Sequence, residues 1–425
     1  MECCPALCHA YEEILARELL SATGCTEPIA IAYAGALARE TLGTLPNAME
    51  LIVSGNIIKN AKSAVVPNTG GLKGLRAAAA AGAFAGRAEK QLEVIAGINA
   101  AQRADLRGYL EQCAIRIEPA TGDEVFDILI TAHAGCDTAR VRITGGHTNV
   151  VLREKNGAAL YQASPEKTPD KSAAYARLNV ADIYAYATKA PLEPTWDLLE
   201  RQIAYNSAIR DEGLTGKWGA AIGATLHKTG CEIKTRAAAA AAAGSDARMS
   251  GCEMPVVINS GSGNQGLTAS LPVIEYAGEL GADRETLHRA LLLSNLLTVH
   301  LKTGIGCLSA YCGAVSAGCA AGAGVAWLNG GDLPAVAHTL VNSLAILSGM
   351  VCDGAKPSCA AKIACAVEAG IFGWQMYQNG RQFYSGDGLV TKGVENTISN
   401  ISRVGREGMR ETDREILQIM LENAY

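Results

Sequence analysis

The chain has 425 residues, enough for two or three domains and a large core. Its net charge is −5 and its basic residues form no long cluster, which excludes the electrostatic footprint of a nucleic-acid-binding protein. Hydrophobic residues make up 49% of the chain but aromatic residues only 5%, so alanine and aliphatic side chains must fill the core.

The N-terminal segment MECCPALCHA has no positively charged region followed by an apolar run, which argues against a signal peptide. Its cysteines Cys3, Cys4 and Cys8 do not fit the C-x-x-C-H signature of haem attachment, and we interpret them as incidental. The alanine-rich run 237–244 is too short to cross a bilayer. We therefore expect a cytoplasmic protein without membrane or nucleic-acid partners, and leave a homo-oligomeric state open.

Apolar residues recur with helical periodicity at 11–22 and 29–42, on either side of the loop TGCTEP. A strand is predicted at 49–54, followed by the polar loop GNIIKNAKSAVVPNTGG and by a helix of small residues at 72–86. The period then changes to alternation, which predicts successive strands with short turns. These strands are 113–118, 126–132, 139–144 and 149–153. They predict an antiparallel β-meander covered on one face.

From about residue 170 onward the pattern predicts helices. These are 171–189, 195–211, 236–248, 283–300, 313–328, 335–350, 360–373 and 410–423. Pro191 and Pro194 indicate a boundary between two domains. The prediction is an α+β fold, with an α+β domain at 1–190 for substrate and base, and an all-helical domain at 191–425 for a metal centre.

The motif INSGSGNQG, residues 258–266, contains the G-x-G-x-x-G pattern of dinucleotide-binding proteins. No series of alternating strands and helices follows it, so the fingerprint lacks its context. We interpret the motif as a glycine-rich turn before a helix, where free N–H groups and Asn264 would hold a small anion. A purely structural turn is the alternative.

Fourteen cysteines are more than packing requires in a chain expected in the cytoplasm, where disulfides are rare. GIGCLSAYCGAVSAGC carries Cys307 and Cys312 before a helix, and VCDGAKPSC carries Cys352 and Cys359. We interpret Cys319, on the same helical face as Cys312, as a packing residue. The spacing lacks the C-x-x-C pairs of zinc sites, whereas an iron–sulfur cluster tolerates wider spacing and can leave one iron without a protein ligand.

Two segments resemble the iron–sulfur-dependent L-serine dehydratases. VCDGAKPSC is similar to their C-D-P-x(4)-P-C-like element, with Gly354 where those enzymes have proline, and SATGCTEPIAIAYA is similar to their S-S-S-H-T-x-G-P substrate loop, with Cys25 near their histidine. With SGNIIKNAK and VPNTGG, the chain resembles still more the L-cysteine desulfidase family and its relatives of unassigned function, over nearly its whole length. The resemblance implies one 4Fe-4S cluster per chain, with three ligands: Cys312 (or its competitor Cys307), Cys352 and Cys359.

Elimination at the β-carbon of an amino acid needs a base for the α-proton and help for the leaving group. No lysine lies in a recognisable context for pyridoxal phosphate (PLP), so we expect no PLP. The open iron of a cluster would act as a Lewis acid, and a soft thiol suits it at least as well as a hydroxyl. Cys25 is the candidate base, because the helix start near Pro28 should lower the pKa of its thiol. Glu27 would instead carry the proton or bind the substrate ammonium.

Polar residues in the neighbouring loops would complete a site for a small amino acid. The candidates are Thr26, Glu27, Asn56, Lys59, Asn60, Asn68, Thr69, Gly70, His147 and Asn264, with His300 and Lys302 as weaker ones. The leading hypothesis is a lyase that converts L-cysteine to pyruvate, ammonia and hydrogen sulfide. The alternatives are a dehydratase of L-serine or of another β-substituted amino acid, and a non-catalytic iron–sulfur sensor that would not need a base at Cys25.

Overall fold

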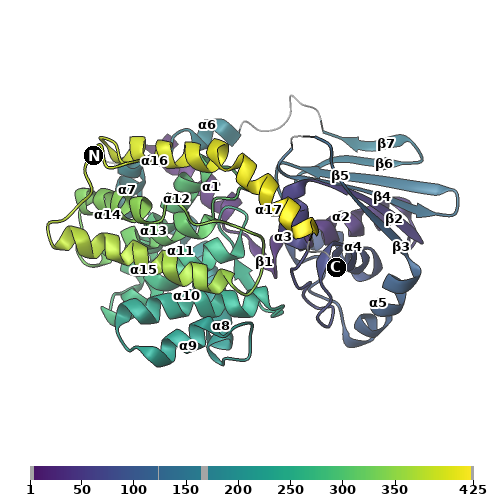
Figure 1. The fold of residues 1–425 in the computed structure, drawn as a ribbon, viewed down its shortest axis with the longest axis horizontal. Helices are drawn as coiled ribbons and strands as arrows, with labels where there is room; N and C mark the ends of the chain where they lie inside the picture. Colours follow the sequence, from purple (N-terminus) through teal and green to yellow (C-terminus); the bar gives the residue numbers. More distant parts are fainter. Residues whose placement is uncertain (1–3, 123, 164–170, 423–425) are drawn as a thin grey trace.

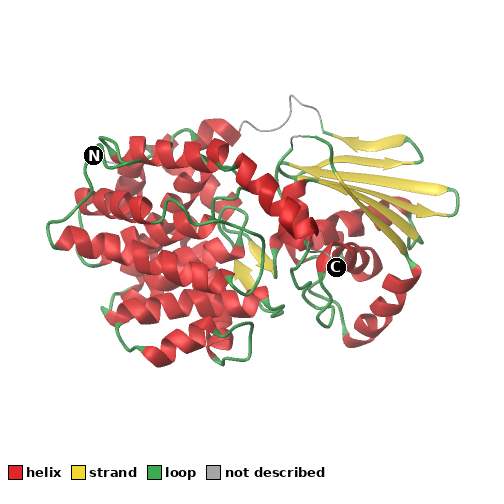
Figure 2. Cartoon of the chain, in the orientation of Figure 1, coloured by secondary structure: helices red, strands yellow, loops and turns green. Residues whose placement is uncertain are grey.

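The computed structural model describes residues 4–122, 124–163 and 171–422. Cys3 and the last residue of the helix predicted at 410–423 lie outside these ranges. One side of the molecule consists mostly of helices, and the other consists of a sheet with helices packed against it, as Figures 1 and 2 show. Within the described ranges, no helix is long and apolar enough to span a bilayer. The α+β fold class is confirmed; the domain boundary near residue 190 stays a prediction.

The sheet has six strands in the order β3-β2-β4-β5-β6-β7. They are β2 (Ala48–Val53), β3 (Ala114–Pro119), β4 (Asp127–Ala134), β5 (Asp137–Thr144), β6 (Val150–Lys155) and β7 (Ala158–Gln162). The antiparallel meander is confirmed for β4, β5 and β6, and β7, which continues it, was not predicted. The prediction that β3 is the first strand of this meander is wrong, because β2 lies between β3 and β4 and runs parallel to β3. Alternation within a strand does not reveal its neighbours.

The helices of this part lie on one face of the sheet or connect β2 to β3. They are α2 (Thr26–Leu42), α3 (Gly55–Ala61), α4 (Gly74–Ala85), η1 (Ala88–Glu93) and α5 (Ala100–Gln112). Parallel pairing of β2 and β3 requires such a long connection. Helix α2 is buried along almost its whole length and crosses α4 closely: a Cβ on Gly82 would lie 1.9 Å from the carbonyl oxygen of Ala32.

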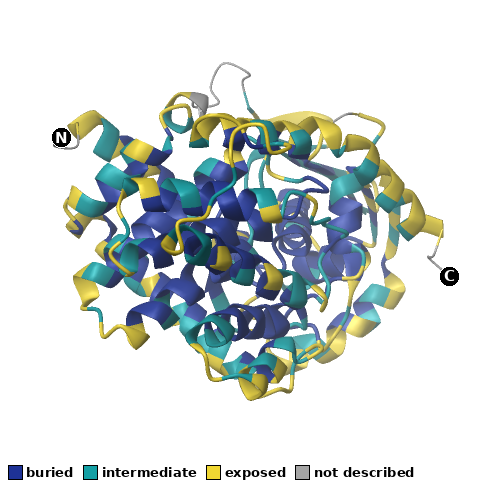
Figure 3. Cartoon of the chain, turned by 60° about the vertical axis from the view of Figure 1, so that its left-hand side comes forward, coloured by how far each residue is buried: buried dark blue, intermediate teal, exposed yellow. Residues whose placement is uncertain are grey.

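The other part contains most of the remaining helices. They are α1 (Pro5–Glu18), α6 (Lys171–Tyr175), α7 (Val180–Lys189), η3 (Glu193–Thr195), α8 (Trp196–Leu214), α9 (Ile222–Thr229), α10 (Ile233–Met249), α11 (Gly263–Glu279), α12 (Arg284–Thr303), α13 (Gly313–Leu328), α14 (Leu333–Ile346), α15 (Cys359–Gln378), α16 (Val394–Arg403) and η4 (Val404–Gly408). Figure 3 shows the buried interior continuing from these helices into the sheet-bearing part.

Two more features connect the two parts of the fold: a short pair of strands and the last helix. Strand β1 (Ser21–Thr23) pairs with β8 (Pro255–Val257), so the prediction of helix at residues 21–22 and of no strand after residue 170 is wrong there. Strands of three residues have no period from which to detect them. The last helix, α17 (Arg410–Glu422), leaves the helical part and packs against α3, as Figure 1 shows. Helix α3 itself was predicted as loop.

Candidate active site

Four helices begin at one cavity of about 110 Å³ between the two parts of the fold. Their first residues or N-caps lie in its wall: Cys25 for α2, Ser262 for α11, Cys312 for α13 and Cys359 for α15. Helix N-termini carry partial positive charge and unpaired N–H groups. The cavity is therefore built to surround negative charge.

Backbone pairing brings two of the cysteine segments together. Tyr311 and Val351 form an antiparallel bridge, in which the N–H of Cys352 donates to Ala310 O at 2.6 Å. The Cys312 and Cys352 thiols are within hydrogen-bonding distance of each other. This hydrogen bond raises the pKa of Cys312 and lowers that of Cys352, so the pair holds its proton on Cys312 and leaves Cys352 as thiolate.

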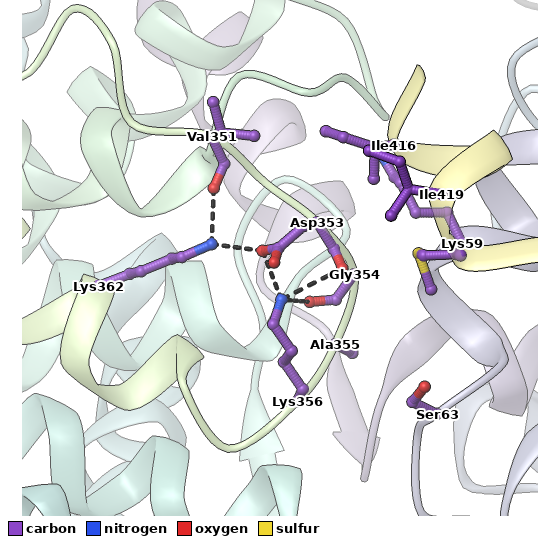
Figure 4. Close-up of a pocket in the computed structure, with 11 residues that line it drawn as sticks. Lys59, Ser63, Val351, Asp353, Gly354, Ala355, Lys356, Lys362, Ile416 and Ile419 are labelled. Atoms are coloured by element: carbon purple, nitrogen blue, oxygen red, sulfur yellow. Dashed lines mark hydrogen bonds and ion pairs between the residues drawn. The ribbon is translucent and has the colours of Figure 1, made fainter. Parts of the chain in front are cut away.

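The loop from Val351 to Cys359 is held in shape from its outer side (Figure 4). Lys362 of α15 donates to Val351 O at 2.7 Å and forms an ion pair with Asp353, which also pairs with Lys356. Gly354 adopts φ +93°, and a Cβ there would lie 2.4 Å from the carbonyl oxygen of Lys59. The bend that directs Cys352 and Cys359 toward the cavity therefore depends on a glycine.

The other two thiols of these segments differ in exposure. Cys359 is half-buried in the cavity wall, and its Sγ lies 3.6 Å from Gly354 O. Cys307 is exposed at the cavity edge, whereas Cys312 is buried beside Cys352. This difference supports Cys312 over Cys307 as the third member of a thiol set with Cys352 and Cys359.

The three thiols suit a cluster better than a single metal ion. In the described part of the chain, no three His, Cys, Asp or Glu side chains converge in the geometry of a metal-ion site. Cysteine thiolates are the usual ligands of iron–sulfur clusters. Cys312, Cys352 and Cys359 come from two loops and line one cavity, in which Lys302 lies close to Cys312 and Cys352. The donor set therefore fits an iron–sulfur cluster.

Cys25 lies in the wall of the same cavity and donates a hydrogen bond to Glu27 Oε2 at 3.1 Å. Burial first, and then the Glu27 carboxylate, raise the pKa of the Cys25 thiol well above its usual range. The expected lowering of this pKa by the helix start is thus wrong. Desolvation of a thiolate outweighs the partial charge of the helix end.

The Glu27 carboxylate is held by its neighbours. It accepts hydrogen bonds from Thr26 Oγ1 at 3.2 Å and from Asn60 Nδ2 at 3.3 Å, and Thr26 also donates to Gly261 O at 2.9 Å. His147 lies beside them, with its ring packed edge-on against Phe126. Burial lowers the pKa of His147, so its imidazole is neutral near pH 7.

Several predicted residues do not line the cavity. Asn68, Thr69 and Gly70 form a separate turn, in which Thr69 Oγ1 donates to Val66 O at 2.7 Å. Lys59 is buried but forms an ion pair with Asp413 of α17. Asn56 is absent from the described cavity wall, as is His300, which hydrogen-bonds Glu395 at 2.8 Å.

The glycine-rich motif has a packing reason for each glycine of its G-x-G-x-x-G pattern. A Cβ on Gly261 would lie 2.8 Å from His147 Cε1, one on Gly263 would lie 2.2 Å from Arg248 Nε, and one on Gly266 would lie 2.0 Å from Val257 O. The motif therefore clears space for side chains of the cavity and for the short strand β8. It does not lie in a βαβ unit.

Sequence reasoning missed several cavity residues, among them Arg248 and Gln265. Arg248 lies in the last turn of α10, and its Nη1 donates to Asn264 Oδ1 at 3.0 Å. The available signal was a basic residue in the last turn of a helix that is rich in alanine. Gln265 gave no signal, because its position depends on the close approach of α11 to Gly313 at the start of α13.

Comparison with known proteins gives a family match over most of the chain. A family model described as the serine dehydratase alpha chain matches residues 89–418, a range that includes the three clustered thiols and Arg248 but not Cys25. A UPF0597 protein of Desulfitobacterium hafniense (strain Y51) is 55% identical over 415 residues, which cover 97% of this chain and 96% of that one. A UPF0597 protein of Finegoldia magna is 48% identical, over 97% of this chain and 99% of that one. A UPF0597 protein of Lachnoclostridium phytofermentans is 45% identical, over 96% of this chain and 98% of that one. These names state no substrate.

Proposed function

The chain belongs to the serine dehydratase alpha chain family, and on that premise we propose that it is an iron–sulfur-dependent lyase that eliminates the β-substituent of a small amino acid. The proposed substrate is L-cysteine, converted with one water molecule to pyruvate, ammonia and hydrogen sulfide without pyridoxal phosphate. Family membership supports the lyase chemistry. The choice of L-cysteine as substrate is supported by the residues of the site.

The observation that carries the proposal is the composition of the cavity wall. It contains the Cys25–Glu27 pair and the thiols of Cys312, Cys352 and Cys359. A β-elimination needs these two functions next to each other, one acting at the α-carbon and one at the β-substituent. When bound, a 4Fe-4S cluster held by these three thiols would supply a Lewis-acidic iron for the β-substituent.

The raised pKa of Cys25 decides how it can act as a base. A buried thiol cannot take the α-proton while it keeps its own, so its proton must leave as the new one arrives. Glu27 Oε2 is in position to accept that proton at 3.1 Å. In the proposed step the Cα–H bond breaks, its proton reaches Cys25 Sγ and the former thiol proton moves to Glu27. The electron pair forms the Cα–Cβ double bond as the Cβ–S bond breaks.

The basicity of the leaving group favours sulfide over water. Departing hydroxide is a strong base and needs an acid to protonate it, whereas hydrosulfide is a far weaker base that leaves as a stable anion. His147, the imidazole in the wall, is neutral near pH 7 because burial lowers its pKa. L-Serine stays the second candidate, because the family's description favours it.

The test is a direct comparison of the two substrates. Protein purified and reconstituted with iron and sulfide under anaerobic conditions is assayed for pyruvate with L-cysteine and L-serine, and for sulfide with L-cysteine. We expect equal amounts of pyruvate and sulfide, and a kcat/KM for L-cysteine at least tenfold above that for L-serine. The reverse ratio would make the protein a serine dehydratase. Turnover of neither amino acid would exclude the proposed reaction.

A further inference from the structure

We propose that Arg248, together with Asn264 and the first turn of α11, forms the subsite that binds the α-carboxylate of the substrate. This rests on the proposed function only in taking an amino acid as the ligand. The inference assigns a role to a buried cation that neither the thiol set nor the Cys25–Glu27 pair requires.

Arg248 is a buried charge without an anionic partner. Its side chain is almost wholly inaccessible to solvent and lies in the cavity wall. Its one hydrogen bond to a side chain goes to the neutral amide oxygen of Asn264, and its Nε has no acceptor. Among the residues described, no carboxylate lies within ion-pair distance of it. A buried guanidinium without a counter-ion is strongly unfavourable, so the site is complete only when an anion binds.

The backbone next to Arg248 leaves room for its side chain. Gly263, the first residue of α11, is the position where a Cβ would lie 2.2 Å from Arg248 Nε. Ser262, the N-cap of this 17-residue helix, makes no side-chain capping bond to the first turn. The N–H groups of that turn therefore remain available beside the guanidinium. A helix N-terminus and an arginine fork are two donors suited to one carboxylate.

Two neighbouring side chains also leave buried polar atoms unpaired in the same wall. These atoms are Nε2 of His147 and Oε1 of Gln265. Native proteins rarely leave such atoms unsatisfied, and these two atoms together with Arg248 Nε indicate a polar ligand. The ligand must also be small, because the cavity, which also contains the three thiols, has a volume of about 110 Å³, well below the ~300–1,000 Å³ of pockets for drug-sized molecules. A free amino acid meets both conditions, and a dinucleotide does not.

The other buried cation of the cavity has different neighbours. Lys302 lies close to Cys307, Cys312 and Cys352, and negative charge on these cysteines raises the pKa of Lys302 against the larger, lowering effect of burial. Arg248 instead influences Cys25 and His147. Arg248 therefore lies on the side of the cavity where the α-carbon must sit for Cys25 to take its proton. A carboxylate on Arg248 places the α-carbon near Cys25.

The experiment separates carboxylate binding from turnover. Binding of L-alanine, which has no leaving group, and of L-alaninamide, which has no carboxylate, is measured by calorimetry on the cluster-loaded protein. The variants are R248Q and R248K, with R236Q as the matched control, because Arg236 lies near the far end of α10 and pairs with Glu279. Circular dichroism and iron content establish that each variant is folded and loaded. Where R248Q is not folded, R248K is the variant that decides.

We expect L-alanine to bind wild-type and R236Q protein roughly 10- to 100-fold more tightly than L-alaninamide, the range for a charge-assisted hydrogen bond. R248Q should remove this preference, and R248K should reduce it. Equal losses for both ligands in the Arg248 variants, an unchanged preference, or no preference in wild type would overturn the subsite. Carboxylate-dependent binding through Arg248 without turnover of any amino acid would retain the subsite and exclude the proposed reaction. Turnover of L-cysteine with an unchanged KM in R248Q would exclude the subsite and retain the proposed reaction.

Discussion

The thiol of Cys25 donates a hydrogen bond of 3.1 Å to the carboxylate of Glu27, two residues further along the chain. Cys25 is the N-cap of α2 and Glu27 lies in its first turn, so the geometry of the pair is set by the start of one helix. Because the same carboxylate raises the pKa of the thiol, the two groups are expected to act together. Replacing either one should give the same catalytic defect.

The first prediction concerns this pair. Cys25→Ala and Glu27→Gln should each lower kcat by about 10²–10⁴-fold, the usual contribution of a positioned base. Both variants should stop exchange of the substrate α-hydrogen with deuterated water, measured by NMR. Iron content and visible absorption should stay as in wild type, because neither residue belongs to the thiol set.

Cys113→Ser is the matched control, since Cys113 is a buried thiol that lies against Pro46 O, away from the cavity. It should keep its turnover per folded molecule. If Cys25→Ala works within about twofold of wild type while Glu27→Gln does not, Glu27 takes the α-proton directly and the relay through the thiol is wrong.

The second prediction concerns the thiol set. Serine in place of Cys312, of Cys352 or of Cys359 should lower the content of iron and of acid-labile sulfide, both measured chemically. Wild-type protein should hold about four of each per chain, and each variant well below that. Cys307→Ser should retain most of the cluster. Cys365→Ser is the control on the same helix as Cys359, and Cys365 is exposed. Loss of iron in Cys307→Ser but not in Cys312→Ser would exchange the roles of these two residues.

Strands β4 to β6 could be predicted from the sequence because each has a local alternating pattern and they follow one another along the chain. The thiol set was inferred from the resemblance of VCDGAKPSC to a family element, and its role as a ligand set stays a prediction. Cys25 was found from the motif GCTEP, but its pKa was predicted in the wrong direction. The helix start is a local feature, whereas the burial that raises the pKa comes from segments far away in sequence.

Other features of the site depend on contacts that no local pattern reports. Arg248 enters the cavity because α10 and α11 meet at Gly263, and Gln265 because α11 meets the start of α13. Asn68 was predicted in the substrate site because it is polar and lies in a loop, but it is buried in a separate turn, where its side-chain amide lies against the Glu253 carboxylate. A polar side chain in a loop can therefore serve the local structure instead of a binding site.

The third prediction concerns Asp413, which joins α17 to α3 and to the segment just before Cys312. Its carboxylate forms an ion pair with the buried Lys59 and accepts a hydrogen bond of 2.8 Å from the N–H of Ala310, two residues before Cys312. Asp413→Asn would leave the Lys59 ammonium without an anionic partner. Breaking a buried pair costs about 3–5 kcal/mol, and we expect the lower end because Asp413 is partly exposed.

The free energy of unfolding from urea titrations measures this loss. Glu411→Gln is the control on the same helix, because Glu411 is largely exposed and pairs with Arg414 at the surface. It should change the stability by less than about 1 kcal/mol. Equal stabilities of the two variants would show that the Lys59–Asp413 pair does not hold α17 in place.

The fourth prediction concerns Gly354, the position where the serine dehydratases that the loop resembles have proline. Proline fixes φ near −65°, whereas Gly354 has φ +93°, so proline cannot take this conformation. Alanine would meet the carbonyl oxygen of Lys59 at 2.4 Å and would also be strained by the positive φ. Because Cys352 and Cys359 lie on either side of this bend, Gly354→Ala and Gly354→Pro should both displace the thiols.

We therefore expect both variants to fold with reduced stability and to hold less iron than wild type, with proline the more severe change. Gly349→Ala is the matched control in the preceding connection, since φ there is not positive and a Cβ would have nothing within 4 Å. It should keep wild-type iron content. A fully loaded, fully active Gly354→Pro protein would mean that the loop takes the proline-compatible conformation of its relatives when the cluster is bound, and the bend described here would not belong to the active form.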